Sequence, residues 1–545
     1  MFPKINRYRK ILSTLAKYGF ADIVSRIEGH YSIKIPLTSS STAQNTYTRI
    51  RLVLEKLGPT FVKLGQMLSL RTDLIPAELA KELSLLQDNV EPVPFDEIKK
   101  QIQDSLKSDL SEIFSYISPK PLATGSLAQV HEGHLKKEDI TIAIKVQRPN
   151  IEHIIKTDLK IAEDLAYLIQ SKIDFLRVYN LPEIIIELKK MILDELDFKK
   201  EVRNINIARY NFQDDDIFYL PKVFKEYCSE KIITMEKIEG TCLKDSISLM
   251  TKKTRKKTAH NLLNILLKQI FEHGFFHADP HPGNIFILDK KICLLDWGMV
   301  GRITPSTRFK LIKLAEGIVK KDIDEIIDVI MFLCYPTDNV DIFSLSIEIQ
   351  DLIDEYYSLP LKDIHLGKML TEITNILRKH DLKIRPEIAV LSKSIMTSEG
   401  SGRILYPEID VISETKPYIK KLTLKKFSPE YIYTQIKKSL YNFYILNKII
   451  PPKINKILDK ISQNKLSIGF EHKNLDNLQK TLDRITNRLV LGLLTASLII
   501  GSSMIITTKI PPLLFGYPAL GLIGYIFSAF LGGWIILDII RKKKF

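Results

Sequence analysis

The chain of 545 residues is 45% hydrophobic and 26% charged, which describes a globular protein of roughly two to four domains with a full core. Its formal net charge of +15 permits a nucleic-acid partner, but the sequence carries no helix-turn-helix, zinc-finger or aromatic RNP motif, so we expect no nucleic acid to bind. The four cysteines form no C-x-x-C pair, which argues against a zinc site or a disulfide framework and favours a reducing compartment.

The first 44 residues read as a basic amphipathic helix followed by a Ser/Thr-rich linker at 39–42. Residues 1–11 contain four basic residues but no apolar stretch of the kind found in a secretory signal. This start resembles an organellar transit peptide only weakly. Over residues 45–115 we expect a helical extension, in which Lys63 and Gln66 lie three apart and so share a helix face.

Two segments at the ends of a predicted small lobe, residues 116–238, suit contact with a nucleotide. Residues 122–130 stand where a loop covering the phosphates would lie, and small side chains let the backbone approach, but the single glycine matches no G-x-G-x-x-G pattern. The apolar strand ending at Glu236 suits a hinge that holds adenine through its backbone, although such strands are as often plain core. The loop residues assigned to ATP are Leu122, Ala123, Thr124, Gly125, Ser126, Leu127, Ala128, Gln129 and Val130.

Lys145 emerges from a buried apolar strand at 142–144, which suits a lysine that reaches the α/β-phosphates. A strand-end lysine that reaches water is the alternative. Farther along the chain, a long helical pattern contains Glu195, Asp197 and Glu201. A glutamate there can pair with Lys145 and fix its position, although acids on a charged helix most often form a solvated face.

Asp279, Asn284 and Asp296 give the strongest functional signal in the chain. Asp279 and Asn284 are five apart, and Asp296 follows an apolar run twelve positions later. In phosphoryl transfer from ATP, one carboxylate orients the nucleophile, while an amide oxygen and a second carboxylate hold Mg²⁺. The order H-x-D-x4-N and then D-[aromatic]-G is that of the protein-kinase fold, with two unrelated polar turns as the alternative. We therefore assign Asp279 and Lys145 to catalysis, and Asn284 and Asp296 to the metal.

Departures from the motifs of ordinary protein kinases narrow the class of substrate that we expect. Ala278 stands where such kinases carry the arginine that reads a phosphorylated activation loop, and His281 replaces their lysine. No Ala-Pro-Glu follows Asp296, so no peptide-docking segment of the usual type is expected. The loop H-x-D-x-H-x-G-N instead resembles small-molecule phosphotransferases.

Residues 239–412 are predicted to form the large lobe, and residues 413–485 a basic helical connector. The connector is either a solvated linker or a surface that lies on anionic headgroups, where each lysine contributes about 1 kcal/mol. Its lysines include Lys416, Lys420, Lys421, Lys425, Lys426, Lys437, Lys438, Lys453 and Lys456.

Residues 486–545 are predicted to form a two-helix membrane anchor. Residues 489–507 and 513–537 are 19 and 25 residues without a charge, and each exceeds the ~18 apolar residues of a membrane span. The link at 508–512 is short enough for a tight hairpin, and Pro518 is expected to shorten or kink the second helix. Basic residues flank both outer ends, which places them and the kinase-like domain in the cytoplasm. A buried hairpin in a soluble core is the alternative. Close helix contact is expected at Gly521, Gly524, Gly532 and Gly533.

Together these motifs resemble the UbiB/AarF/ADCK group of atypical kinases over residues 45–410. The segment 58–66, which contains Lys63, Gly65 and Gln66, matches the KxGQ signature of that family, and residues 122–130 match its alanine-rich loop. The ExD pair of the family corresponds to Glu195 and Asp197. Two departures are Gly125, where alanine is usual, and Trp297, where phenylalanine is usual.

The resemblance implies an α+β, protein-kinase-like two-lobed fold with a helical N-terminal KxGQ extension and a C-terminal transmembrane hairpin. It also implies that the KxGQ face looks into the active site, with Lys63 near Glu195 or Asp197 in a regulatory role. The expected function is a kinase or ATPase of the bacterial plasma membrane that uses ATP and Mg²⁺ and supports isoprenoid-quinone (ubiquinone-type) biosynthesis. Its expected partners are anionic membrane lipids and quinone-biosynthesis enzymes or precursors. A small-molecule or lipid phosphotransferase and a nucleotide-binding pseudokinase scaffold remain as alternatives.

Overall fold

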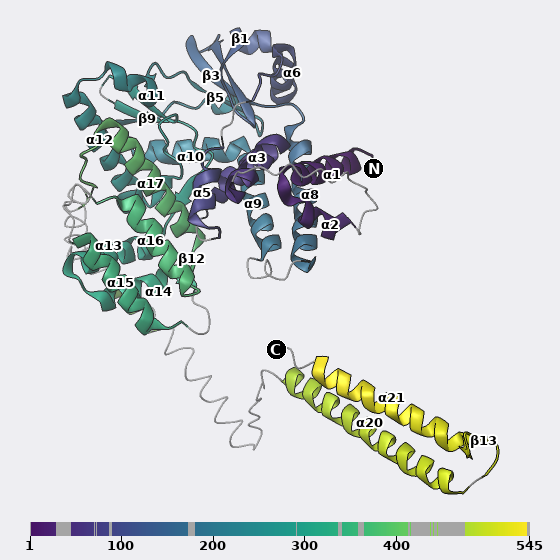
Figure 1. The fold of residues 1–545 in the computed structure, drawn as a ribbon. Helices are drawn as coiled ribbons and strands as arrows, with labels where there is room; N and C mark the ends of the chain where they lie inside the picture. Colours follow the sequence, from purple (N-terminus) through teal and green to yellow (C-terminus); the bar gives the residue numbers. More distant parts are fainter. Residues whose placement is uncertain are drawn as a thin grey trace. The chain divides into compact units, whose positions relative to one another are not determined.

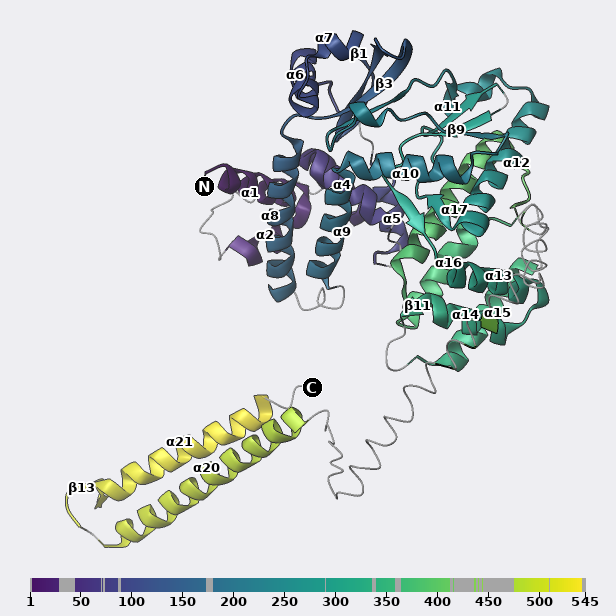
Figure 2. The same ribbon diagram turned by 180° about the vertical axis from the view of Figure 1, so that it is seen from behind.

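The computed structural model consists of two compact units, residues 1–433 and 434–545 (Figures 1 and 2). The Ser/Thr-rich linker and most of the basic connector, including all its named lysines except Lys437, lie outside the described residues. The described residues are 2–28, 45–411 and 475–541, without 70, 72–73, 87–89, 173–179, 290, 336–339, 358–363 and 509, and with the isolated residues 415, 436–437, 440 and 444.

The small lobe is built on an antiparallel sheet of order β1-β2-β3-β5. Because side chains alternate along a strand, Ile142, Ile144 and Val146 face one side of β3 and are fully buried, while Lys145 faces the other side. The buried face packs on α6 (Phe95–Leu106), which therefore belongs with the sheet although the sequence placed it in the extension. The strands are β1 (Phe114–Thr124), β2 (Ala128–Leu135), β3 (Ile140–Gln147) and β5 (Ile232–Glu236).

A helical layer joins the N-terminal segment to the helices between β3 and β5. The predicted basic amphipathic helix exists, but its apolar face is part of this core: Ile11 and Leu12 are buried, and Arg7 binds Asp158 at 2.6 Å. Asp158 is itself almost fully buried, so this pair fixes the N-terminal helix on α8. The helices are α1 (Phe2–Leu15), α2 (Ala21–Glu28), α3 (Thr46–Leu57), α4 (Pro59–Ser69), α5 (Ala77–Leu83), α8 (Ile151–Lys172), α9 (Leu181–Glu195) and α10 (Phe198–Asn211).

The large lobe combines a small mixed sheet of order β4-β9-β8-β6 with a set of helices. The connection from β7 to β8 carries Asp279 and Asn284, and the chain leaving β9 carries Asp296. The strands of this sheet are β4 (Phe218–Tyr219), β6 (Thr241–Cys242), β8 (Ile285–Leu288) and β9 (Lys291–Leu294). Two further strand pairs are β7 (Phe275–His277) with β10 (Val300–Arg302) and β11 (Cys334–Tyr335) with β12 (Lys383–Ile384). Its helices include α11 (Leu243–Ser246), α12 (Lys252–Leu267), α13 (Pro305–Lys320), α14 (Ile323–Leu333), α15 (Ile342–Tyr357), α16 (Leu366–Lys379) and α17 (Pro386–Leu405).

The second unit is a helical hairpin of α20 (Leu475–Thr507) and α21 (Ala519–Arg541). Each helix contains a stretch long and apolar enough to cross a membrane, Ile485–Thr507 and Ala519–Leu537, and only 11% of each stretch is buried. The second helix begins directly after Pro518, so this proline shortens the predicted span and does not kink it.

Three of the four glycines predicted at the helix contact lie there, since a Cβ on Gly532 would lie 3.9 Å from the Thr495 side chain of α20. A Cβ on Gly521 would come within 2.6 Å of the Ile506 side chain, and one on Gly524 would overlap the Ser502 hydroxyl. A Cβ on Gly533 would meet nothing within 4 Å, so the prediction was wrong for that residue. The close approach of α20 and α21 therefore depends on the N-terminal half of α21.

Candidate active site

Three elements distant in the sequence bring their charges together at Lys145. The Lys145 Nζ donates hydrogen bonds to both carboxylate oxygens of Glu201, at 2.9 and 2.8 Å, and to Asp296 Oδ1 at 2.9 Å. Lys145 comes from β3, Glu201 from the first turn of α10 and Asp296 from the chain after β9. The sequence motifs predicted that these three residues belong to one site. Among the acids of residues 194–201, the structure shows that Glu201 is the one that pairs with Lys145.

Burial and the neighbouring charges shift the pKa values of the three cluster residues. Burial alone would lower the pKa of Lys145, but the Asp296 and Glu201 carboxylates outweigh it and raise that pKa above its ordinary value. For Glu201, which is 4% exposed, burial outweighs the nearby lysine and raises the pKa to about 7. The Lys145 charge holds the pKa of Asp296 well below its usual range. Because the Asp296 side chain is 49% exposed, it is the acid of this cluster that a ligand can reach.

A second ion pair connects the KxGQ helix to this cluster. The Lys63 Nζ on α4 lies 2.5 Å from Glu195 Oε1, and each side chain is 14% exposed. Burial raises the pKa of Glu195, while Lys63 acts against that rise. Lys63 also acts, after Lys145, to lower the pKa of Asp296. A Cβ on Gly298 would lie 3.4 Å from Asp296 Oδ1 and 3.8 Å from the Glu195 side chain, so the two acids lie close together. The structure thus brings Lys63, Glu195 and Asp296 into one electrostatic neighbourhood.

The other two residues of these motifs have contacts outside the cluster. Asp197 caps α10, since its side chain accepts the Lys199 backbone N–H at 3.1 Å. Gln66 donates to the Leu86 carbonyl at 3.1 Å and so ties α4 to the segment after α5. Gly65, which lies between Lys63 and Gln66, is required by packing, because a Cβ there would overlap the Leu86 side chain. The KxGQ pattern therefore combines one charged contact with two features that hold the extension together.

The connection after β7 is shaped by a neutral histidine. The His277 Nδ1 accepts the Asp279 backbone N–H at 3.1 Å, which leaves Nε2 to donate to the Leu295 carbonyl at 3.0 Å. Burial lowers the pKa of His277, in agreement with this neutral form. His277 therefore links the backbone of Asp279 to the residue before Asp296. This arrangement keeps the catalytic and metal-binding candidates at neighbouring points of the fold.

Polar residues of other helices hold the same connection, and no sequence motif marks them. Ser394 and Ser401 on α17 donate to the carbonyls of His277 and Pro280, at 2.7 and 3.0 Å. Gln269 accepts the His277 backbone N–H at 2.9 Å. All three side chains are buried. In a sequence they look like ordinary polar residues within helices, and only their buried partners reveal that they position Asp279.

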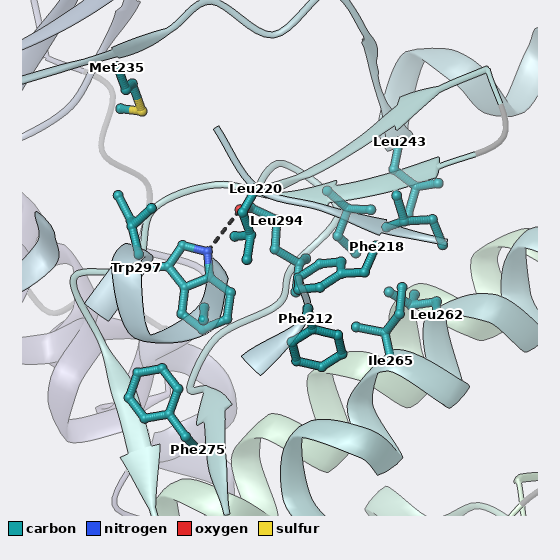
Figure 3. Close-up of a cluster of buried hydrophobic side chains, with 14 of the residues drawn as sticks. Phe212, Phe218, Leu220, Met235, Leu243, Leu262, Ile265, Phe275, Leu294 and Trp297 are labelled. Atoms are coloured by element: carbon teal, nitrogen blue, oxygen red, sulfur yellow. Dashed lines mark hydrogen bonds between the residues drawn. The ribbon is translucent and has the colours of Figure 1, made fainter. Parts of the chain in front are cut away.

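Trp297 anchors the segment that follows Asp296. Its ring is 1% exposed, stacks on Phe275 at 5.9 Å and meets the edge of His277 at 5.0 Å. The indole Nε1 donates to the Leu294 carbonyl at 2.9 Å, as Figure 3 shows among the surrounding apolar side chains. Trp297, which stands in place of the phenylalanine usual in the family, is therefore buried at a position where its additional N–H has a partner. Asp296 itself adopts a φ of +61°, which turns the chain sharply at this point.

The loop at 122–130 contains both exposed and buried residues. Leu122 and Ala123 are exposed on β1, whereas Leu127 packs into the core below. Gln129 is fully buried and its side chain bonds the backbone of Val93, so its side chain serves the fold. A Cβ on Gly125 would lie 3.6 Å from the Ala128 carbonyl, so the alanine usual in the family would fit there. Contacts to a nucleotide from Leu127 and Gln129 would therefore come from their backbone.

At the end of β5, the Glu236 side chain is held by protein groups. It accepts from the Tyr219 hydroxyl at 2.9 and 2.7 Å and from the Lys222 backbone N–H at 3.1 Å. The backbone N–H of Glu236 donates to the Lys222 carbonyl at 2.8 Å. A contact with adenine at this residue is thus left to its carbonyl, in keeping with a hinge that would bind through the main chain.

The donors expected for Mg²⁺ fit that ion by their chemistry. Asn284 uses its amide nitrogen to donate to the Asp279 carbonyl at 3.5 Å, which leaves its amide oxygen as an acceptor. Asp296 has a second carboxylate oxygen beyond the one bonded to Lys145. The two residues are joined through the backbone, because the Leu295 N–H donates to the Asn284 carbonyl at 2.9 Å. One amide and one carboxylate oxygen are a usual protein contribution to a Mg²⁺ site completed by water and phosphate.

A two-lobed α+β fold with a strand lysine, a helix glutamate and an aspartate after β9 defines a protein-kinase-like protein. Comparison with known sequences gives the family. Residues 85–330 match the ABC1 atypical kinase-like domain, residues 349–410 the UbiB helical domain, and residues 473–541 the ABC1/UbiB kinase-like C-terminal domain. The chain belongs to the UbiB family of atypical kinases, which confirms the resemblance drawn from its motifs.

Relatives match most of the chain. It is 32% identical over 99% of both chains to an uncharacterized protein in the hydrogenase 1 5′ region of Clostridium pasteurianum. It is 31% identical to the probable protein kinase UbiB of Aeromonas hydrophila, over 80% of this chain and 83% of that one. Among solved structures, the Rv3197–erythromycin complex from Mycobacterium tuberculosis matches with a TM-score of 0.46 and 20% identity, over 67% of this chain and 93% of that one.

Proposed function

We propose that this chain binds Mg·ATP at the Lys145 cluster and acts as a membrane-bound ATPase or kinase that supports isoprenoid-quinone biosynthesis. The observation that carries the proposal is the joint hydrogen bonding of Lys145 to Glu201 and Asp296. This arrangement fixes one cation beside an exposed carboxylate, which is the electrostatic setting that phosphoryl transfer requires. The quinone assignment rests on membership in the UbiB family.

Each residue then has a role that follows from its position. Lys145, fixed by Glu201, would neutralise the α/β-phosphates, and the backbone of residues 122–130 would cover them. Asn284 and Asp296 would hold Mg²⁺, which supplies charge neutralisation for the phosphates when bound. Asp279 would accept the proton of the attacking hydroxyl or water.

The Lys63–Glu195 pair supports a regulatory role for the KxGQ helix. A lysine whose charge is felt at Asp296 changes the local field at the place where metal and phosphates would bind. The pair is 14% exposed on each side, so it is weakly screened by solvent and salt. We therefore propose that α4 tunes nucleotide binding and is more than a cover over the site.

The C-terminal hairpin supports attachment to a membrane. Two apolar helices with little burial in their own unit need an apolar environment, which a bilayer provides. The basic residues at the outer ends favour the cytoplasmic side for both termini of the hairpin. We propose the bacterial plasma membrane, with anionic lipids and quinone-biosynthesis proteins or precursors as partners.

The deciding experiment measures turnover of γ-labelled ATP by the full chain, in detergent and in lipid vesicles. Release of labelled phosphate without a labelled acceptor supports the ATPase. A labelled lipid or small molecule supports the alternative phosphotransferase. Nucleotide binding without turnover in either setting would contradict an enzymatic function and favour the scaffold.

A further inference from the structure

A cavity in the helical part of the large lobe has no role in the proposed chemistry. It has a volume of about 420 Å³ and is lined by residues of α13, α14, α15 and α16, together with Ile364 and Thr415. These helices follow one another in the chain and pack in sequence, α13 on α14, α14 on α15 and α15 on α16 (Figure 1). The volume lies within the range of about 300–1,000 Å³ that is usual for small-molecule sites.

The cavity wall is apolar over most of its length. Its members on α15 run from Ile349 to Tyr357, a rise of about 12 Å at 1.5 Å per residue. Ile318 on α13, Ile330 on α14 and Met369 on α16 line the other sides. An extended apolar wall of this length suits a flexible chain better than a compact polar molecule.

Every hydroxyl in the described lining is already used by the protein. The Tyr356 hydroxyl donates to Glu372 at 2.8 Å, and the Tyr357 hydroxyl donates to two carbonyls of α13 at 2.6 and 2.7 Å. The Thr415 hydroxyl donates to the Val411 carbonyl at 2.7 Å. A ligand would therefore find dispersion contacts and few hydrogen-bond partners, which selects against polar molecules.

Water is a poor occupant of such a space. A buried water needs two to four polar partners, and the hydroxyls of this wall already donate to other groups of the protein. An empty apolar space forfeits the contacts of the side chains around it. A hydrocarbon chain supplies those contacts without requiring a hydrogen bond.

We propose that the α13–α16 cavity binds the hydrocarbon tail of a lipid, either an isoprenoid or an acyl chain. This inference rests on the proposed function for one point, that the protein works at a membrane on isoprenoid-linked chemistry. The cavity would hold the tail while the polar head remains outside it. The cavity and the Lys145 cluster are formed by different residues, so tail binding and ATP turnover can be measured separately.

The test is photoaffinity labelling of the full chain in vesicles without nucleotide. The probes are diazirine derivatives of geranylgeraniol and of palmitate, and mass spectrometry locates the labelled peptides. We expect label on α13, α15 and α16 that excess unlabelled geranylgeraniol or palmitate displaces. Preference for the first probe identifies an isoprenoid, and equal labelling identifies acyl chains in general. Label confined to α20 and α21, or label that competitor does not displace, would overturn the proposal.

A matched pair of variants on α15 controls for the location of the site. Ile353→Trp fills the cavity from its wall, while Ile347→Trp places the same ring at a position that is 45% exposed and outside the lining. We expect the first variant to reduce displaceable labelling roughly tenfold and the second to leave it unchanged. Because Ile353→Trp can also disturb packing, competition in the parent protein provides an independent result. Equal labelling of both variants would contradict the assignment.

Discussion

The Asn204 side chain donates a buried hydrogen bond of 3.0 Å to the Trp297 carbonyl. Asn204 lies on α10 one turn after Glu201, and Trp297 directly follows Asp296. This single bond therefore joins the helix that supplies one carboxylate to the segment that supplies the other. It holds Glu201 and Asp296 at positions from which both reach Lys145.

Asn204→Ala should weaken both folding and turnover. It leaves the Trp297 carbonyl buried without this partner, a loss of about 1–3 kcal/mol. The melting temperature and the rate of ATP turnover should both fall. Asn206→Ala is the matched control, because Asn206 bonds within its own helix, to the Val202 carbonyl at 2.8 Å. Similar turnover in the two variants would show that the bond to Trp297 does not position Asp296.

Lys63→Ala should change nucleotide affinity or turnover while the protein remains folded. The change removes the charge 2.5 Å from Glu195, so Glu195 will take up a proton more readily. Turnover of ATP and of GTP is compared with that of Lys81→Ala, which alters an exposed lysine of the same extension. If neither activity nor nucleotide selectivity differs between these variants, the KxGQ helix only covers the site.

Asp279→Asn should lower turnover by about 10²-fold or more, the usual range for a lost acid–base group. Binding should be nearly unchanged, because the backbone of this residue, not its carboxylate, makes the bond to His277. Steady-state turnover is measured beside equilibrium ATP binding. Asp289→Asn, in an exposed turn, is the control. Turnover that survives the substitution would remove Asp279 from the chemistry.

Asp296→Asn should weaken binding of Mg·ATP strongly and of free ATP only slightly. The substitution removes a charged oxygen donor for Mg²⁺ and leaves Lys145 with Glu201 as its partner. Titrations with and without Mg²⁺ separate the two effects. Equal Mg·ATP affinity in the parent and the variant would refute the metal assignment.

Glu201→Gln should alter the pH dependence of stability. Burial raises the pKa of Glu201 from 4.5 to about 7. Between these values the folded protein keeps a proton that the unfolded chain has released, so the Glu201 contribution to stability is lost as pH rises. The melting temperature of the parent should therefore decline across this window relative to that of Glu201→Gln. Parallel melting curves at every pH would contradict the raised pKa.

Local patterns in the sequence were sufficient to predict the general fold and to select the charged residues that meet at Lys145. The alternation of apolar residues placed Lys145 on the face of β3 opposite the buried Ile142 and Ile144, because successive side chains of a strand face opposite sides. The order of Lys145, Asp279, Asn284 and Asp296 indicated the kinase-like fold, since phosphoryl transfer needs these groups in one place. Two long apolar segments indicated the C-terminal hairpin by length alone.

Tertiary packing decided which residues meet. Glu195 and Glu201 belong to one acidic stretch, but the helix breaks between them, so one pairs with Lys63 and the other with Lys145. The basic N-terminal helix is part of the core because Ile11 and Leu12 pack in one cluster with residues of α8, where Asp158 also binds Arg7. Local sequence determines which groups a segment carries, whereas the partner of each group depends on elements that only the packed core brings together.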